Sequence, residues 1–292
     1  MSFKNDTLST TRLSRSQGNS KAGSLCNFHT HTSFCDGADT PRELVEVALQ
    51  KGMRALGFSG HTPLCYGDPG TMTLDGENEY KQEVLRLRDE YEGRIEIYLG
   101  LENDAIDPHD RDDYEYIVGA VHFVVKDGER YCVDMSMAEM DRALRDGFSG
   151  DGLALIRNYF EQMVHFTKNT RPDILAHFDL PVKFNSGNRY FDEESPAYQK
   201  LALEALEAAS AYCQVVELNT GGMARGYRDT PYPAPFILKR LHELKCPVIL
   251  SADAHQAQNL DFAFDNATEL LRQTGFSERA QFGKNGFYMV EL

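Results

Sequence analysis

The chain has 292 residues, of which 41% are hydrophobic and 26% are charged. This length fits a single α/β barrel of roughly 250 residues plus a tail, and the apolar fraction excludes disorder of the whole chain. Thirty basic residues against 45 acidic ones give a formal net charge of −15, which excludes extended nucleic-acid binding but leaves room for a small anionic substrate beside bound cations.

The first 24 residues are rich in Ser, Thr, Asn and Lys and contain almost no apolar side chains. Such a segment cannot contribute to a core, so residues 1–24 are predicted to be a disordered polar tail; a solvated extension is favoured over an organellar transit peptide. Residues 25–292 show no internal repeat and no linker rich in Pro or Ser, which predicts one domain.

From residue 25 onward, short apolar runs alternate with longer helical patterns, which is the rhythm of a parallel βα architecture. Strands are predicted at residues 25–29, 55–59, 95–101, 117–123, 173–177, 215–219 and 247–251. Helices are predicted at 41–51, 77–92, 137–145, 152–168, 196–212, 234–244 and 259–273, and residues 287–292 can add a terminal strand. Seven strand–helix units favour a barrel over an open sheet.

The start of the first helix is the best specified boundary. Thr40 is a predicted N-cap, Pro41 occupies the first helical position, and Glu43 completes a capping box. Gly52 is the predicted stop signal.

The compartment is predicted from the cysteines and from the lack of a membrane segment. Six cysteines show no CxxC pair and no framework spacing, so they are interpreted as free thiols; they are Cys26, Cys35, Cys65, Cys132, Cys213 and Cys246. No stretch approaches the roughly 20 apolar residues of a membrane helix. The expected location is the cytoplasm, with no membrane partner, whereas the oligomeric state is left open.

Histidines and carboxylates follow the ends of the predicted strands. They are His29 and His31 after the first, His61 after the second, Glu102 after the third, His122 after the fourth, His177 after the fifth, and Asp253 with His255 after the seventh. In a barrel of parallel strands these ends share one face. Any one histidine taken alone is more often a hydrogen-bonded structural residue, but the joint pattern indicates a site.

The spacing of the pairs predicts metal binding. In His29-Thr30-His31 and in Asp253-Ala254-His255, alternate residues of an extended segment point the same way, so both side chains can hold one ion. Mixed imidazole and carboxylate ligands suit Zn, Mn or Fe better than Mg or Ca. Three further histidines, His109, His165 and His242, lie in charged or helical stretches and are interpreted as surface or core residues.

Six motifs together resemble the polymerase and histidinol phosphatase (PHP) family over nearly all of residues 25–292. They are "FHTHTSFCDG", "GFSGHTPL", "LGLENDAI", "GAVHFV", "ILAHFDL" and "LSADAH". Two further stretches, "KFN" and "NTGGMARGYRDTPYPAPFILKRL", resemble the histidinol-phosphatase branch. The resemblance implies a distorted seven-stranded (βα) TIM-like barrel, a PHP barrel, with a cluster of two or three divalent transition metals.

The resemblance also implies a ligand set for each metal. The first metal would be held by His29, His31, Glu102 and Asp253, the second by Glu102, His122 and His177, and the third by Asp36, His61 and His255. Glu102 would bridge the first two metals, and Asp36 stands where some relatives have histidine.

The reaction expected from such a site is attack of an activated water on a phosphate ester. Glu102, Asp253 and His255 are the candidate catalytic residues, with Asp253 or His255 protonating the leaving alcohol. Arg225, Arg228 and Lys183 are candidate substrate-binding residues, because guanidinium and ammonium groups match phosphate. For each of these cations an ordinary surface or salt-bridge role stays open.

Three functions remain open at this point. The resemblance favours hydrolysis of L-histidinol phosphate to L-histidinol and phosphate, in histidine biosynthesis. An alternative is a phosphoesterase that acts on another small phosphate monoester or on a nucleotide. A third is a non-catalytic, metal-stabilised scaffold, which the retained ligand set disfavours.

Overall fold

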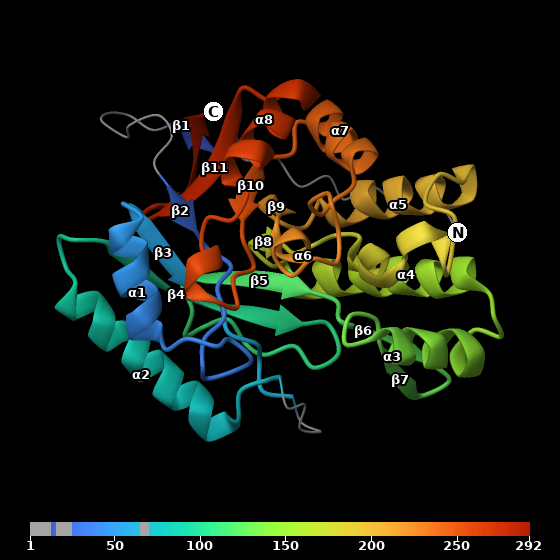
Figure 1. The fold of residues 1–292 in the computed structure, drawn as a ribbon, viewed down its shortest axis with the longest axis horizontal. Coiled ribbons are helices and arrows are strands. Elements are labelled where there is room, and N and C mark those ends of the chain that lie inside the picture. The colour runs from blue at the N-terminus through green and yellow to red at the C-terminus, as the bar shows by residue number, and fades with distance from the viewer. Residues whose placement is uncertain (1–12, 16–24, 65–69) are drawn as a thin grey trace.

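The computed structural model describes residues 13–15, 25–64 and 70–292. Seven parallel strands form its centre, with helices around them (Figure 1). They are β2 (Cys26–Asn27), β3 (Ala55–Phe58), β4 (Glu96–Asp104), β5 (Tyr116–Ala120), β8 (Ile174–Leu175), β9 (Val215–Asn219) and β10 (Val248–Ser251). All seven predicted strands are present in the predicted order, which confirms the α/β class.

The strands pair side by side in chain order from β2 to β10, each parallel to the next. A parallel bridge between Thr30 and Ala254 joins the chain just after β2 to the chain just after β10. Toward its other end, β10 pairs with β11 (Glu278–Gly283) rather than with β2. Within the described ranges, this bridge links the two ends of the strand series, and the closed seven-stranded barrel stays a prediction.

The sheet continues beyond the seven predicted strands. β11 pairs with the antiparallel β12 (Gly286–Glu291), which matches the terminal strand predicted at 287–292. β12 in turn pairs with β1 (Ser14–Arg15), which lies inside the predicted disordered tail. The apolar side chain of Leu13 packs against the core there, which explains this departure; the other residues of the tail lie outside the described ranges.

A β-hairpin was not predicted from the sequence. The predicted strand 117–123 ends at Ala120, and β6 (Phe123–Lys126) then pairs with β7 (Glu129–Cys132). Asp127 and Gly128 form the turn with φ values of 52° and 85°. An Asp-Gly pair is a strong hairpin signal, because these residues tolerate positive φ values. The sequence therefore contains a signal that predicts this hairpin.

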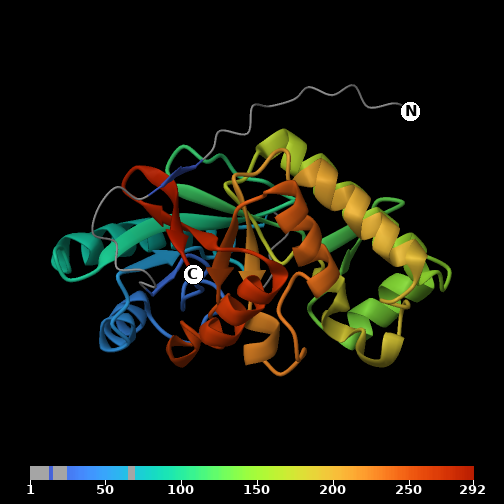
Figure 2. The same ribbon diagram turned by 90° about the horizontal axis from the view of Figure 1, so that it is seen from above.

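Helices of at least one turn connect and cover the strands. They are α1 (Pro41–Gln50), α2 (Leu74–Glu90), α3 (Met137–Arg142), the π-helical segment η1 (Ala143–Gly147), α4 (Gly152–Thr170), η2 (Leu180–Phe184), η3 (Ser186–Asn188), α5 (Pro196–Ala209), α6 (Gly221–Ala224), α7 (Pro235–Leu244), η4 (Ala257–Asn259) and α8 (Phe264–Thr274). Seen from above, α4 and α5 run side by side at the edge of the molecule (Figure 2). No helix in the described ranges is long and apolar enough to span a bilayer.

Most predicted helices are present within a few residues of their expected bounds. The capping box of Thr40 and Glu43 is formed as predicted, and Gly52 follows the helix with a φ of 71°. The last predicted helix, 259–273, is split into η4 and α8, because Ala263 adopts a left-handed φ of 55° just before α8 begins. α6 was not predicted, since four residues give no helical periodicity.

An aromatic layer fills the sheet interior below the carboxyl ends of the strands. Phe28, Tyr98, Tyr116 and Phe282 pack there with ring centroids 5.2 to 6.0 Å apart. Gly100 is required beside this layer, since a Cβ at that position would lie 2.3 Å from the Tyr116 ring. The layer closes the interior from below, so polar side chains at the strand ends rest on a packed apolar floor.

Candidate metal centre

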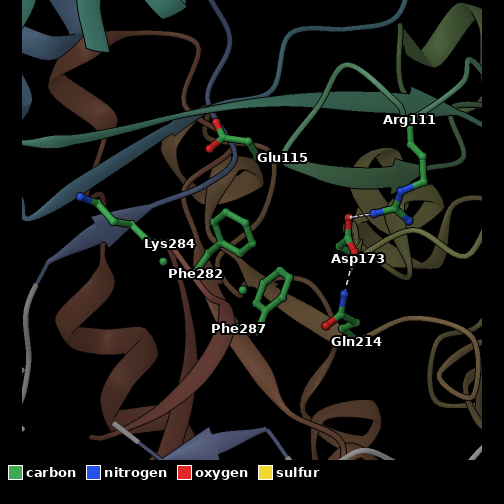
Figure 3. A pocket seen from close by; sticks show the side chains of 9 residues that line it. Arg111, Glu115, Asp173, Gln214, Phe282, Lys284 and Phe287 are labelled. Atoms are coloured by element: carbon green, nitrogen blue, oxygen red, sulfur yellow. Dashed lines mark hydrogen bonds and ion pairs between the residues drawn. The ribbon is translucent and has the colours of Figure 1, made fainter. Parts of the chain in front are cut away.

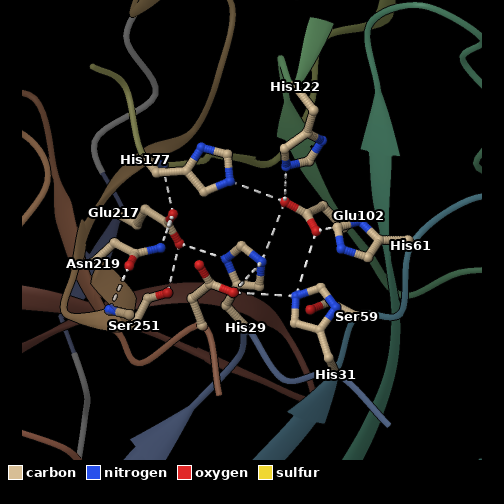
Figure 4. A network of polar contacts seen from close by, with 12 residues as sticks. His29, His31, Ser59, His61, Glu102, His122, His177, Glu217, Asn219 and Ser251 are labelled. Carbon is tan, nitrogen blue, oxygen red and sulfur yellow. Dashed lines mark hydrogen bonds and ion pairs between the residues drawn. The ribbon is translucent and has the colours of Figure 1, made fainter. Parts of the chain in front are cut away.

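The nine predicted ligands come together at the carboxyl ends of the strands. Figure 4 shows the deep part of this group, around Glu102. His29, His31 and Asp36 lie in the segment after β2, and His61 lies after β3. Glu102 lies in β4, while His122 follows β5 and His177 follows β8. Asp253 and His255 follow β10. The parallel topology produces this convergence, because every strand ends at the same face.

Glu102 lies at the centre of the group and is 1% exposed. Each of its two oxygens faces imidazole nitrogens. The distances are 3.1 Å to His177, 3.3 Å to His29 and 3.4 Å to His122 from Oε1, and 2.9 Å to His61 and 3.4 Å to His31 from Oε2. The two oxygens of this one carboxylate lie close to five imidazoles, as expected of a carboxylate that bridges two metal ions.

A second group lies nearer the surface, around Asp36. The carboxylate of Asp36 is 36% exposed and lies 3.0 Å from Nε2 of His255, 3.4 Å from Nδ1 of His31 and 3.6 Å from Nε2 of His61. Nδ1 of His255 lies 3.0 Å from the carbonyl oxygen of Asp253. A guanidinium nitrogen of Arg225 also lies 3.0 Å from Nδ1. Because arginine can only donate, Nδ1 accepts this hydrogen bond and Nε2 carries the proton that points at Asp36.

Asp253 connects the two groups from a constrained backbone position. Its φ is 47°, a left-handed value that is uncommon outside glycine and is often found at functional sites. Its Oδ1 lies 3.3 Å from Nε2 of His31 and 3.7 Å from Nε2 of His29. Gly221 leaves room for it, since a Cβ there would lie 2.8 Å from the Asp253 carboxylate.

The donor set fits divalent transition metals. Four combinations of ligand atoms lie within 4.8 Å of one another: His29, His31 and Asp253; His29, Glu102 and His177; His61, Glu102 and His122; and His31, Asp36, His61 and His255. Four buried atoms of these described ligands have no hydrogen-bond partner, namely Nε2 of His29, Nε2 of His31, Oε2 of Glu102 and Nδ1 of His177. Buried polar atoms are rarely left unpaired, so an ion is the natural partner of these atoms.

These combinations differ in detail from the ligand sets that the family resemblance implies. The third set is reproduced and gains His31. His122 and His177, expected to share one ion through Glu102, fall into two combinations, although both imidazoles lie within 3.4 Å of the same Glu102 oxygen.

The charges of the cluster balance one another. Burial alone would raise the pKa of Glu102, but the imidazoles of His61, His29 and His122 hold it well below its usual range. Burial lowers the pKa of His122, yet neighbouring carboxylates, Glu102 first, raise it to about 10. Burial and adjacent imidazoles lower the pKa of His31 to about 3. Histidine ligands must be neutral to bind a metal, so metal binding should release the proton of an imidazole with a raised pKa, such as that of His122.

Two supporting carboxylates were not singled out from the sequence. Asp104 accepts a hydrogen bond from Nδ1 of His122 at 2.7 Å, and Glu217 does the same for His29 at 2.9 Å. Asp104 follows Glu102 by two residues in β4, so strand alternation predicts that both point to the same side. Glu217 is a charged residue inside the apolar run of β9, which is itself an unusual signal.

The three candidate substrate-binding cations have different surroundings in the structure. Arg225 donates to Oδ2 of Asp253 at 2.8 Å and thus lies at the cluster. Arg228 forms a two-pronged ion pair with Glu193, at 3.0 and 2.8 Å, and also donates to a backbone carbonyl. The predicted role of Arg228 in binding substrate therefore finds no support in the geometry, because the guanidinium is occupied elsewhere.

Lys183 has an intermediate position. Its ammonium donates to the carbonyl of Asp134 at 2.7 Å and lies 4.9 Å from the ring centroid of Tyr227. Burial raises the pKa of Asp134, but Lys183 and the nearby His122 lower it to about 2. Lys183 is thus linked to the metal centre through Asp134 rather than by direct contact with a ligand.

The remaining histidines and the cysteines behave as expected. His109, His165 and His242 belong to none of the ligand combinations among the described residues. The five cysteines of the described ranges form no disulfide, and Cys65 lies outside those ranges.

A separate hollow lies at the amino ends of β5, β8 and β9. It has a volume of about 350 Å³, and Phe282 and Phe287 form part of its lining (Figure 3). Asp173 on its wall is paired with Arg111 and Gln214, each at 2.7 Å. Because these polar groups satisfy one another, and because catalytic residues of such folds lie at the opposite ends of the strands, this hollow is not the candidate site.

Comparison with known proteins places the chain among metal-dependent phosphatases. The PHP domain model matches residues 27–221. A probable histidinol-phosphatase of Deinococcus radiodurans is 30% identical over 262 residues, covering 86% of this chain and 94% of that protein. The histidinol-phosphatase of Bacillus subtilis is 26% identical over 259 residues, covering 81% of this chain and 96% of that protein.

A solved structure has a similar fold. It is the histidinol phosphate phosphatase of Lactococcus lactis in complex with zinc, L-histidinol and phosphate. The TM-score is 0.67 at 19% identity, with 90% of this chain and 98% of that chain covered.

Proposed function

Because the chain belongs to the PHP domain family, we propose that it is a metal-dependent phosphatase that hydrolyses L-histidinol phosphate to L-histidinol and inorganic phosphate. The observation that carries the proposal is the buried cluster of imidazole and carboxylate atoms around Glu102, with partnerless nitrogen and oxygen atoms aimed into it. The substrate is suggested by the relatives, several of which are histidinol-phosphatases.

Two or three divalent transition metals, Zn, Mn or Fe, are the cofactors of this proposal. The deep side of the cluster, around Glu102, would hold two of them, and the group around Asp36 would hold the third. When bound, such ions supply an activated water and stabilise the charge that develops on the phosphoryl oxygens.

The protein's own residues position the substrate and exclude water. Arg225 holds Asp253 in place through one guanidinium nitrogen, while its Nε is buried without a partner. A guanidinium placed in this way can contribute a hydrogen bond to a phosphate oxygen next to the cluster. The aromatic layer under the strand ends keeps bulk water from reaching the site from below.

His255 is the proposed proton donor to the leaving alcohol. Of the two candidates, the His255 side chain is 19% exposed and that of Asp253 only 6%, so the imidazole is the group that a bound substrate can reach. His255→Gln should therefore slow hydrolysis of an alkyl phosphate far more than that of p-nitrophenyl phosphate, whose leaving group needs no proton. Equal losses on both substrates would show that His255 acts only in metal binding.

The proposed activity is tested by phosphate release from L-histidinol phosphate and from a panel of other phosphate monoesters, with added Mn or Zn or with chelator. The expected result is metal-dependent hydrolysis with kcat/KM for L-histidinol phosphate far above the panel, since that ratio reports transition-state discrimination. Metal-dependent hydrolysis without the preference would favour another small phosphate ester. Absence of turnover despite bound metal would favour the scaffold.

A cytoplasmic location is part of the proposal. The five cysteines of the described ranges form no disulfide, which is typical of proteins from reducing compartments. The partner proposed for the chain is a small phosphate monoester rather than nucleic acid, given the net charge of −15.

A further inference from the structure

Glu217 is a buried carboxylate that lies behind the metal centre rather than in it (Figure 4). It is fully buried in β9 and receives four hydrogen bonds. Oε2 accepts from Nδ1 of His29 at 2.9 Å and from the hydroxyl of Ser251 at 2.5 Å. Oε1 accepts from the backbone N–H of His177 at 2.6 Å and from the side-chain amide of Asn219 at 2.7 Å.

The four donors belong to four different parts of the sheet. His29 follows β2, His177 follows β8, Asn219 ends β9 and Ser251 ends β10. An ionised carboxylate has about four lone-pair directions, and each is used once here. One side chain thereby fixes the carboxyl ends of these strands relative to one another.

The hydrogen bond to His29 also determines which nitrogen of that imidazole is free. Because Glu217 can only accept, Nδ1 of His29 must carry the proton, and the lone pair is left on Nε2. Nε2 is buried without a hydrogen-bond partner and points at Glu102, 3.3 Å away, and at Asp253, 3.7 Å away. The orientation and the tautomer of His29 are therefore both set for metal binding.

We propose that Glu217 is a positioning residue of the metal centre: it holds His29 as the Nδ1–H tautomer with Nε2 directed at the metal, and it fixes the backbone that carries His177. The role rests on the proposed metal-dependent function. Carboxylates behind metal-bound histidines change metal affinity or activity by about 10- to 100-fold when they are removed.

Glu217→Gln is the informative variant. A glutamine keeps the shape of the side chain but presents one oxygen and one NH₂ group to four donors, so one pair of donors must face another donor. If the glutamine oxygen faces His29 and Ser251, its NH₂ group faces the donors of His177 and Asn219. In the reverse orientation, the NH₂ group faces the Nδ1 proton of His29. Either way the support of one ligand is lost.

The expected result is about 10- to 100-fold weaker metal binding, measured by competition with a chromogenic chelator. The absorption bands of the cobalt-substituted protein should change as well, because they report ligand geometry. Asp173→Asn is the matched control, since Asp173 is also a buried, fully bonded carboxylate but lies at the amino ends of the strands. This control should lower stability and leave metal affinity and the cobalt spectrum unchanged.

A measurement on the wild-type protein covers the case in which the variant does not fold. In the zinc-loaded protein labelled with ¹⁵N-histidine, two-bond ¹H–¹⁵N correlations should show His29 with its proton on Nδ1. A proton on Nε2 of His29, or unchanged metal affinity in a folded Glu217→Gln variant, would overturn the role of Glu217. A wild-type protein that binds no transition metal would instead contradict the proposed function itself.

Discussion

Replacement of Glu102 by glutamine should remove most of the metal affinity while leaving a folded protein. A unit charge about 4 Å from a divalent ion contributes about 8 kcal/mol at an effective dielectric constant of 20. Even if water and neighbouring groups recover half of this, about 4 kcal/mol is lost, which is roughly a thousandfold in affinity. The 4 Å separation is a conservative choice, since a coordinating carboxylate oxygen lies about 2.0–2.2 Å from a zinc ion.

The assay is the metal content of purified Glu102→Gln protein after dialysis, followed by competition titration with a chromogenic chelator. Thermal unfolding in chelator gives the control for folding, because an imidazole with a raised pKa, such as that of His122, can lose its proton once the carboxylate charge is gone. A folded variant that retains two or more metals with affinity within threefold of wild type would refute the assignment of Glu102 as the central ligand.

Further predictions concern residues around the cluster. Arg228→Met should lower stability by about 1–3 kcal/mol and leave KM within about twofold, because its guanidinium is held by a carboxylate away from the ligands; urea unfolding and steady-state kinetics check this, and a large rise in KM would contradict it. Gly221→Ala should weaken metal binding about 10- to 100-fold, since the new Cβ would displace Asp253; unchanged metal content would count against this packing. In the presence of chelator, Lys183→Met should lower the free energy of unfolding by about 1–3 kcal/mol at pH 6. The pKa of Asp134 is lowered to about 2 from its ordinary value, so the stabilisation by Lys183 is present above about pH 4 and fades as pH falls through about 2; a difference in unfolding free energy that does not shrink with falling pH would contradict this.

Much of the fold was predictable because each parallel strand is a short apolar run that alternates with a helical pattern. Apolar runs of β type located all seven parallel strands, and the capping residues located α1. The edge beyond β10 was harder to predict. β1 is formed by Ser14 and Arg15 alone, and no periodicity can be detected over two residues. The split of the last helix depends on the left-handed backbone of Ala263, for which alanine gives no signal.

The candidate site was predictable at the level of its ligands but not of its supports. His29 and His31 are marked by their spacing, and their convergence with Asp253 follows from parallel topology. The partners of Arg225 and Arg228 could not be predicted, because two arginines three residues apart in one loop look alike in sequence. Only the structure shows that one contacts Asp253 and the other Glu193.

The bridge between the segments after β2 and β10 has a consequence for protein synthesis. Asn27 accepts a hydrogen bond from the backbone N–H of Ala252, across 225 positions of the chain, and Thr30 pairs with Ala254 beside it. A chain emerging from the ribosome carries His29 and His31 from the beginning but acquires Asp253 and His255 only near the end. The complete ligand set can therefore form only after His255 has been synthesised, so full metal loading should follow the synthesis of residues 29–255 rather than accompany it.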